Sequence, residues 1–223
     1  MSKKLFVETL VKFLLGVILV GLLVFIPAGT LSYFQGWLFM GVLFIPIFIM
    51  GIVMMIKSPE LLKKRLNSKE KEKEQSLVVK LGGLMFMVGF ILAGLSFRFN
   101  WLVLPKAVSI CASVTFLLSY LMYAEVLREN AYLSRIIEVQ ENQKVVDTGL
   151  YGIIRHPMYS ATLVLFLSIP LILGSAVSFV VFLMYPLIIV KRIQNEEKLL
   201  EKELMGYAEY KKKVKYRLIP YIW

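Results

Sequence analysis

The sequence predicts an all-α, polytopic membrane protein of about six helices, and two observations carry that prediction. The 223-residue chain is 58% hydrophobic and has a mean hydropathy of +0.73, which is too apolar for an ordinary soluble domain. Its apolar residues are also gathered into long runs, each near the ~20 residues that an α-helix needs to cross the hydrocarbon core of a bilayer.

The runs are taken in chain order. Four of them are long enough to span, at 5–26, 34–56, 77–97 and 102–124. Two shorter runs follow at 158–174 and 177–190, and each contains a proline that would kink a helix. These last two are predicted either to span or to form a hairpin that crosses incompletely.

Charge predicts the orientation of the bundle. With the N-terminus inside, the inner regions hold 23 of the 26 Lys and Arg residues, Lys12 lies within the first run, and only Arg98 and Lys106 fall outside. Cytoplasmic loops carry such an excess, so the N-terminus and the C-terminus are both predicted inside. The basic residues that give the net charge of +11 are then expected to face the anionic lipids of the cytoplasmic leaflet, which would be their partners. A nucleic-acid partner is not expected.

A charged linker divides the chain. Residues 57–80 begin with a segment whose Leu61, Leu62 and Leu66 fit a short amphipathic helix on the bilayer surface, and an alternating Lys/Glu run follows from Lys69 to Glu74. The predicted division is residues 1–76, an N-terminal hairpin with its linker, and residues 77–223, which carry every candidate site residue.

Between the fourth and fifth runs the chain leaves the membrane. Short β-branched stretches at 136–139 and 144–146 flank a polar turn, which favours extended or hairpin-like structure covering the membrane face. Pro157 fits the first position of the next helix, because its missing N–H would be unpaired there in any case. Arg155 and His156 therefore lie at a helix N-terminus, a place that suits a carboxylate.

After the sixth run the chain keeps helical spacing over 191–210, which predicts a C-terminal amphipathic helix with one apolar stripe. Gly206 is expected to end or bend this helix. The aromatic, apolar tail at 216–223 is expected to pack back onto the protein or the membrane interface.

Topology brings two charged motifs together. The turn at Ser175 and Ala176 is so short that the fifth and sixth segments must be antiparallel neighbours. The motif around His156, the only histidine, therefore meets the motif at 192–197 at one membrane face. His156 and Tyr159 share a helix face, as do Arg192 and Glu196.

From the residues alone, this cluster has two interpretations. It binds a charged ligand, since ionisable groups at a membrane boundary are costly to keep without a use. Alternatively, Arg155 reaches lipid phosphates, His156 caps its helix, and Arg192 pairs with Glu196 only for structure. No metal is expected, because nothing has His-x-x-x-His or Cys-x-x-Cys spacing and Cys111 is the sole cysteine.

Several short motifs then occur in a fixed order. They are Gly-x-Tyr, Arg-His-Pro-x-Tyr, Arg-Ile-x-x-Glu-Glu-x-x-Leu, Gly-Tyr-x-x-Tyr and Arg-Leu-Ile-Pro, at 149–151, 155–159, 192–200, 206–210 and 217–220. With this pattern the sequence resembles the isoprenylcysteine carboxyl methyltransferase family, whose membrane enzymes share a C-terminal core with phospholipid N-methyltransferases. The resemblance is strongest over 130–223.

The resemblance implies S-adenosylmethionine (SAM) as methyl donor, covered by the loop at 143–151. Arg192 is then expected to orient an anionic acceptor, and Glu197 to remove a proton from an amine or thiol acceptor. The resemblance thus implies Arg192 and Glu197 as the catalytic residues. The cofactor-binding residues that it implies are Gln143, Val146, Gly149, Tyr151, Arg155, His156, Tyr159, Glu196 and Leu200.

The predicted function is an integral membrane, SAM-dependent methyltransferase that acts on a lipid-like or prenylcysteine-like acceptor at the cytoplasmic face. Ser160 and the turn at 174–176 depart from eukaryotic prenylcysteine enzymes, which keeps other acceptors open. The alternatives are a phospholipid N-methyltransferase, a small-thiol S-methyltransferase and, from another class, a non-catalytic transport or assembly protein.

Overall fold

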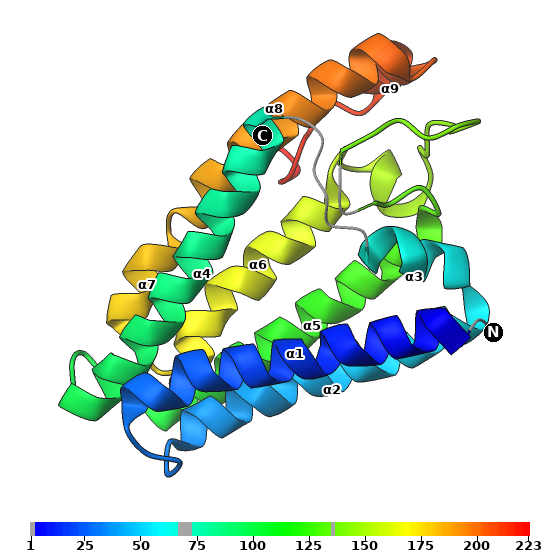
Figure 1. Ribbon diagram of the computed structural model, residues 1–223. Coiled ribbons are helices and arrows are strands. Elements are labelled where there is room, and N and C mark those ends of the chain that lie inside the picture. Colours follow the sequence, from blue (N-terminus) through cyan, green and yellow to red (C-terminus); the bar gives the residue numbers. More distant parts are fainter. Residues whose placement is uncertain (1–2, 67–72, 135–136) are drawn as a thin grey trace.

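The computed structural model describes residues 3–66, 73–134 and 137–223, and the regular elements of these residues are helices. Figure 1 shows them as a bundle of long helices, with the short helices α3 and α9 toward one end and the short helix α7 toward the other. In chain order they are α1 (Lys3–Ala28), α2 (Phe34–Lys57), α3 (Pro59–Leu66), α4 (Lys73–Phe99), α5 (Lys106–Glu129), the 3-10 helix η1 (Gly149–Gly152), α6 (Pro157–Ile172), α7 (Ala176–Phe182), α8 (Tyr185–Glu203) and α9 (Tyr207–Lys213).

The membrane prediction is confirmed. Five helical stretches among the described residues are long and apolar enough to span a bilayer, and the shorter apolar helix α6 lies among them. The chain is therefore a multi-pass, all-helical membrane protein, while the inside location of its termini stays a prediction. The five stretches are Leu5–Ala28, Phe34–Lys57, Ser76–Phe99, Lys106–Glu129 and Ala176–Glu203.

Two of the departures from the predicted segments involve proline. The fourth run was expected to be helical from residue 102, but α5 begins only at Lys106 because Pro105 takes an extended conformation (φ −57°, ψ 146°). The sixth run is two helices rather than one. α7 ends at Phe182 and α8 restarts at Tyr185, next to Pro186, whose ring fits the first turn of a helix better than its interior.

The short helix α3 forms as predicted, but its leucines contact the protein. Leu61 and Leu62 are buried against Met54 of α2 and Leu127 of α5, so the helix packs on the bundle instead of presenting these side chains to lipid. The alternating run from Lys69 lies largely outside the described residues.

Close packing joins the N-terminal hairpin to the remaining helices. Figure 1 shows α1 beside α2, and α1 also packs along α4, where a Cβ at Gly94 would meet the carbonyl oxygen of Val24 at 2.6 Å. Gly89 and Ala93 give α4 a face of small residues: a Cβ at Gly89 would lie 2.3 Å from the Phe182 ring of α7, and Ala93 is fully buried.

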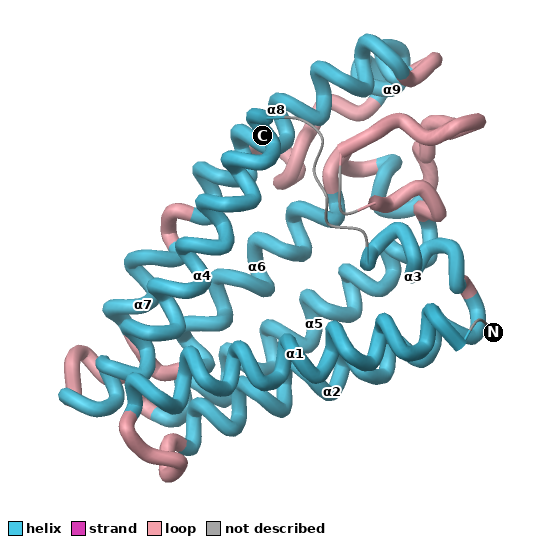
Figure 2. The backbone as a smooth tube through the Cα atoms, in the orientation of Figure 1, coloured by secondary structure: helices cyan, strands magenta, loops and turns pink. Residues whose placement is uncertain are grey.

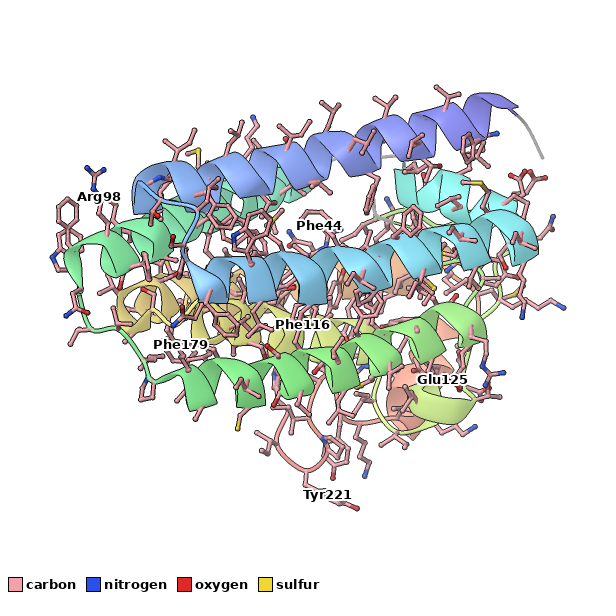
Figure 3. The ribbon with its side chains drawn as sticks, turned by 90° about the horizontal axis from the view of Figure 1, so that it is seen from below. Phe44, Arg98, Phe116, Glu125, Phe179 and Tyr221 are labelled. Atoms are coloured by element: carbon pink, nitrogen blue, oxygen red, sulfur yellow. The ribbon has the colours of Figure 1, made fainter. Side chains whose placement is uncertain are left out.

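The bundle has two distinct ends. Figure 3 places Arg98 at one end and Glu125 toward the other, with Phe116 between them. The turns around residues 29–33, 100–105 and 174–175 share the Arg98 end. The opposite end carries the irregular segment between α5 and α6, which Figure 2 shows beside α3 and near the region of α8 and α9. The described residues of that segment make a turn at 140–143 but no strand pair, so among them the expected hairpin is present only as a turn.

Candidate active site

A polar pocket lies at this second end, where α6 begins and α8 ends. It contains about 830 Å³ of space free of atoms and is partly open to solvent. Its walls come from the start of α6, the C-terminal half of α8, the covering segment between α5 and α6, and α9. The predicted antiparallel arrangement has thus brought both charged motifs to one place.

A hydrogen-bonded chain of three side chains forms one wall of the pocket. The Tyr159 hydroxyl donates to the Glu196 carboxylate at 2.5 Å and accepts from Arg192 Nε at 3.0 Å. Tyr159 is on the first turn of α6, and the other two are one turn apart on α8. This chain fixes a carboxylate and a guanidinium at the pocket's surface.

Beneath this wall lies a buried ionic cluster centred on Glu197, which is 3% exposed. One of its carboxylate oxygens accepts from Arg155 Nε at 2.7 Å and lies 3.3 Å from His156 Nε2, while the other accepts from Arg217 Nε at 2.9 Å. Both oxygens therefore have cationic or polar partners. Such pairing is what allows charges to be buried without a large desolvation penalty.

The cluster also anchors the segment after α9. Arg155 Nη1 donates to the carbonyl oxygens of Val214 and Lys215 at 2.7 and 2.8 Å. The backbone N–H groups of Arg155 and His156 donate to the carbonyls of Tyr216 and Arg217, each at 2.9 Å. The expected packing of the tail on the protein is confirmed, and it holds the start of α6 in place.

The covering segment is tied down through Tyr151. Its hydroxyl accepts from Asn130 at 3.1 Å, and its carbonyl accepts from the Tyr210 hydroxyl at 2.8 Å. Burial raises the pKa of Tyr151 above its ordinary value, so the hydroxyl stays protonated at neutral pH. One side chain thus links the end of α5, η1 and α9 around the pocket.

Gly149 has a structural reason to be glycine. Its φ is +51°, a conformation that side chains other than glycine seldom adopt, and a Cβ there would meet Glu129 Oε1 at 1.4 Å. The other carboxylate oxygen of Glu129 accepts from the backbone N–H of Leu150 at 3.1 Å. The absence of a side chain at Gly149 therefore allows η1 to pack against Glu129 at the end of α5.

Tyr207 supplies an unpaired polar group. Its side chain lines the pocket and is 4% exposed, yet its buried hydroxyl has no hydrogen-bond partner among the described residues. Burial, with the nearby Glu197 and Glu196 carboxylates, raises its pKa, so it remains a donor. A buried unpaired hydroxyl costs free energy unless a ligand or water meets it.

The pocket gathers most of the residues predicted from the sequence. Neither Glu197, which lies in the buried cluster, nor Gly149, which packs on Glu129, lines it. The predicted residues that do line it are Gln143, Val146, Tyr151, Arg155, His156, Tyr159, Arg192, Glu196 and Leu200.

Several lining residues were not predicted. Tyr207 and Tyr210 belong to the Gly-Tyr-x-x-Tyr motif, so the sequence carried a signal for them. Asn130, Tyr132 and Met158 had no distinguishing pattern, and only the fold brings them to the pocket.

The comparison with known families can now be set beside this geometry. Residues 108–202 match the model of the isoprenylcysteine carboxyl methyltransferase (ICMT) family, a little under half of the chain. This segment is similar to the ICMT family. It runs from α5 to the end of α8 and includes the covering segment, the Tyr159 wall and Glu197, whereas α9 and the tail lie beyond it. No curated protein matches the chain.

The ICMT match and the spanning helices together support a membrane methyltransferase of this family. Methyltransferases of the ICMT family use SAM, and the family's name refers to a prenylcysteine carboxyl acceptor.

Proposed function

We propose that this protein binds SAM in the polar pocket and transfers its methyl group to a lipid-like acceptor that carries a carboxylate, at the cytoplasmic membrane face. The observation that carries the proposal is a pocket that combines the Glu196 carboxylate and the start of α6, both in the ICMT segment, with the unpaired Tyr207 hydroxyl of α9, which lies beyond it.

The residues present fit the chemistry of SAM. Glu196 is suited to the cofactor's ammonium group, because a carboxylate forms strong hydrogen bonds with cations. The N-terminus of α6 at His156 is suited to its carboxylate. The Tyr207 hydroxyl is suited to an acceptor atom such as a ring nitrogen or a hydroxyl oxygen.

SAM, when bound, supplies an electrophilic methyl group on a sulfonium. The task of the chain is then alignment and exclusion of water, which an in-line displacement requires more than acid–base chemistry. The covering segment and Tyr151 shield part of the pocket from water. Arg192, held through Tyr159, orients the acceptor's oxygens, since its planar fork can grip two of them.

We assign Glu197 a positioning role in place of the predicted general base. Its two oxygens already accept from Arg155 and Arg217, and it does not line the pocket. Arg155 likewise already donates hydrogen bonds to Glu197 and to the carbonyls after α9, in the absence of any ligand. This distribution favours a carboxylate acceptor over an amine or a thiol, because a carboxylate needs no base.

Binding of the cofactor tests the proposal directly. In titration calorimetry on the detergent-solubilised protein, SAM and its demethylated product should bind without a metal. Glu196→Gln should weaken binding roughly ten- to a hundredfold, the effect of losing a charge-assisted hydrogen bond of about 1.5–3 kcal/mol.

Glu201→Gln is the matched control. Glu201 lies on the same helix, is exposed and pairs with Lys211, so its loss should leave cofactor affinity unchanged. Folded wild-type protein that binds no cofactor at millimolar concentration would overturn the methyltransferase assignment. Equal weakening in both variants would show that Glu196 acts only through general charge.

A further inference from the structure

A second cavity, apolar and larger than the polar pocket, opens between the N-terminal hairpin and the ICMT segment. It contains about 1,730 Å³ of space free of atoms and is lined by α1, α2, α3, α5 and α6. Along α2 the lining runs from Leu43 to Met55. At 1.5 Å per residue this is about 18 Å, a little more than one leaflet's share of a ~30 Å hydrocarbon core. We call this cavity the apolar groove.

Arg65 of α3 lies where the groove approaches the polar pocket. Its side chain lines the groove and donates to the Tyr123 hydroxyl, also a groove residue. Its Nη1 donates to the Ser134 carbonyl at 3.1 Å and lies 3.9 Å from Met158 Sδ. Ser134 and Met158 both line the polar pocket. Arg65 therefore touches groups of both cavities.

Among the described residues, no negative charge balances Arg65 in the groove. Its hydrogen-bond partners there are a hydroxyl, a carbonyl and a thioether, none of which carries a negative charge. The other cation at the groove, Lys12, pairs with Glu8 at 2.7 Å. A half-buried guanidinium with neutral partners favours an anionic ligand group beside it.

We propose that the apolar groove holds the hydrocarbon chain of the methyl acceptor and that Arg65 binds the acceptor's anionic headgroup where the groove meets the polar pocket. The identity of this ligand as the acceptor rests on the proposed function. A chain in the groove and a headgroup at Arg65 place the reacting end toward Met158, the residue before Tyr159. Arg65 is thus a positioning residue supplied from outside the ICMT segment.

The groove can be filled without disturbing its helix. Gly51 lines it, and a Cβ at Gly51 would meet nothing within 4 Å. Gly51→Leu therefore puts a side chain into open space and improves helix propensity at the same time. Gly83→Leu is the matched control, because Gly83 is also a helical glycine whose Cβ would meet nothing within 4 Å, and it is not a groove residue.

The test uses palmitate and hexadecanol, each with a diazirine near its methyl end, and the protein in nanodiscs of zwitterionic phospholipid without cofactor. Photolabelled peptides identify where the chain lies. In the wild type both probes should label the groove segments of α1 and α2, and palmitate should do so at the lower concentration. Gly51→Leu should reduce this labelling several-fold for both probes, and Gly83→Leu should not.

Variants of Arg65 separate headgroup binding from support of the fold. Arg65→Gln should raise the half-saturating concentration of palmitate about tenfold and leave hexadecanol unchanged. Arg65→Lys should keep part of the preference for palmitate. Lys63→Gln, on the exposed side of the same helix, should behave as the wild type, which controls for surface charge. In methylation assays Arg65→Gln should raise KM and spare kcat.

Each failure has its own meaning. Labelling that Gly51→Leu does not reduce would show that the probes report bulk lipid and not the groove. Equal weakening of both probes by Arg65→Gln would show that Arg65 only supports α3. A wild type that binds palmitate in the groove but no SAM would overturn the proposed function, while the binding of an anionic chain would stand.

Discussion

Replacement of Glu197 by glutamine is the variant that best separates support from catalysis. The side chain keeps its size but loses the charge that balances Arg155 and Arg217, and Arg155 is itself only 6% exposed. Breaking a buried ion pair on one side costs about 3–5 kcal/mol, because an uncompensated charge remains in the interior. For a chain of this length that corresponds to a fall in Tm on the order of 10 °C.

The assay is thermal unfolding in detergent, followed by helical circular dichroism, with cofactor affinity measured on the same preparation. Glu196→Gln, one residue away but lining the pocket, should change Tm little and cofactor affinity strongly. Glu197→Gln should mainly lower Tm and should affect cofactor affinity less. If Glu197→Gln keeps the wild-type Tm and cofactor affinity but loses methyl transfer, Glu197 is the general base and the positioning role is wrong.

Three further variants test the pocket. Tyr207→Phe should lower cofactor affinity several-fold without lowering Tm, since its hydroxyl has no partner among the described residues; calorimetry and unfolding decide. Arg192→Lys keeps the charge but loses the planar fork, so methyl transfer should fall steeply at unchanged cofactor affinity; surviving activity would favour an amine or thiol acceptor. Gly149→Ala should expose the covering segment to protease, because its Cβ would collide with Glu129; unchanged digestion would refute this explanation.

The meeting of the two charged motifs was predictable because it needed only a count of apolar runs and one short turn. Once α6 and the segment after it are antiparallel, Tyr159 and Glu196 have to approach each other. The Tyr159 hydroxyl lies 2.5 Å from Glu196 Oε2. The roles of two residues that are neighbours in the sequence are harder to predict. Glu196 and Glu197 are identical in type, and which one faces the pocket depends on the rotation of α8, which its partners Arg155 and Arg217 fix.

Features that depend on distant contacts were beyond the sequence. Gly149 was expected near the cofactor, yet its requirement comes from Glu129, twenty residues earlier in the chain. The leucines of α3 were expected on the bilayer surface because a short amphipathic pattern does not tell lipid from a protein partner such as Met54. Only the packing of α2, α3 and α5 decides between them.

The backbone pairing of Arg155 and His156 with Tyr216 and Arg217 sets an order of events during synthesis. Each pair is separated by about sixty residues, and the later member follows the five spanning stretches of the described residues. These five stretches are therefore made before the groups that fix the start of α6 exist. A nascent chain halted after α8 would carry Arg192 and Glu196 but lack the carbonyls that hold Arg155. The polar pocket is thus completed only after the last spanning stretch has been synthesised.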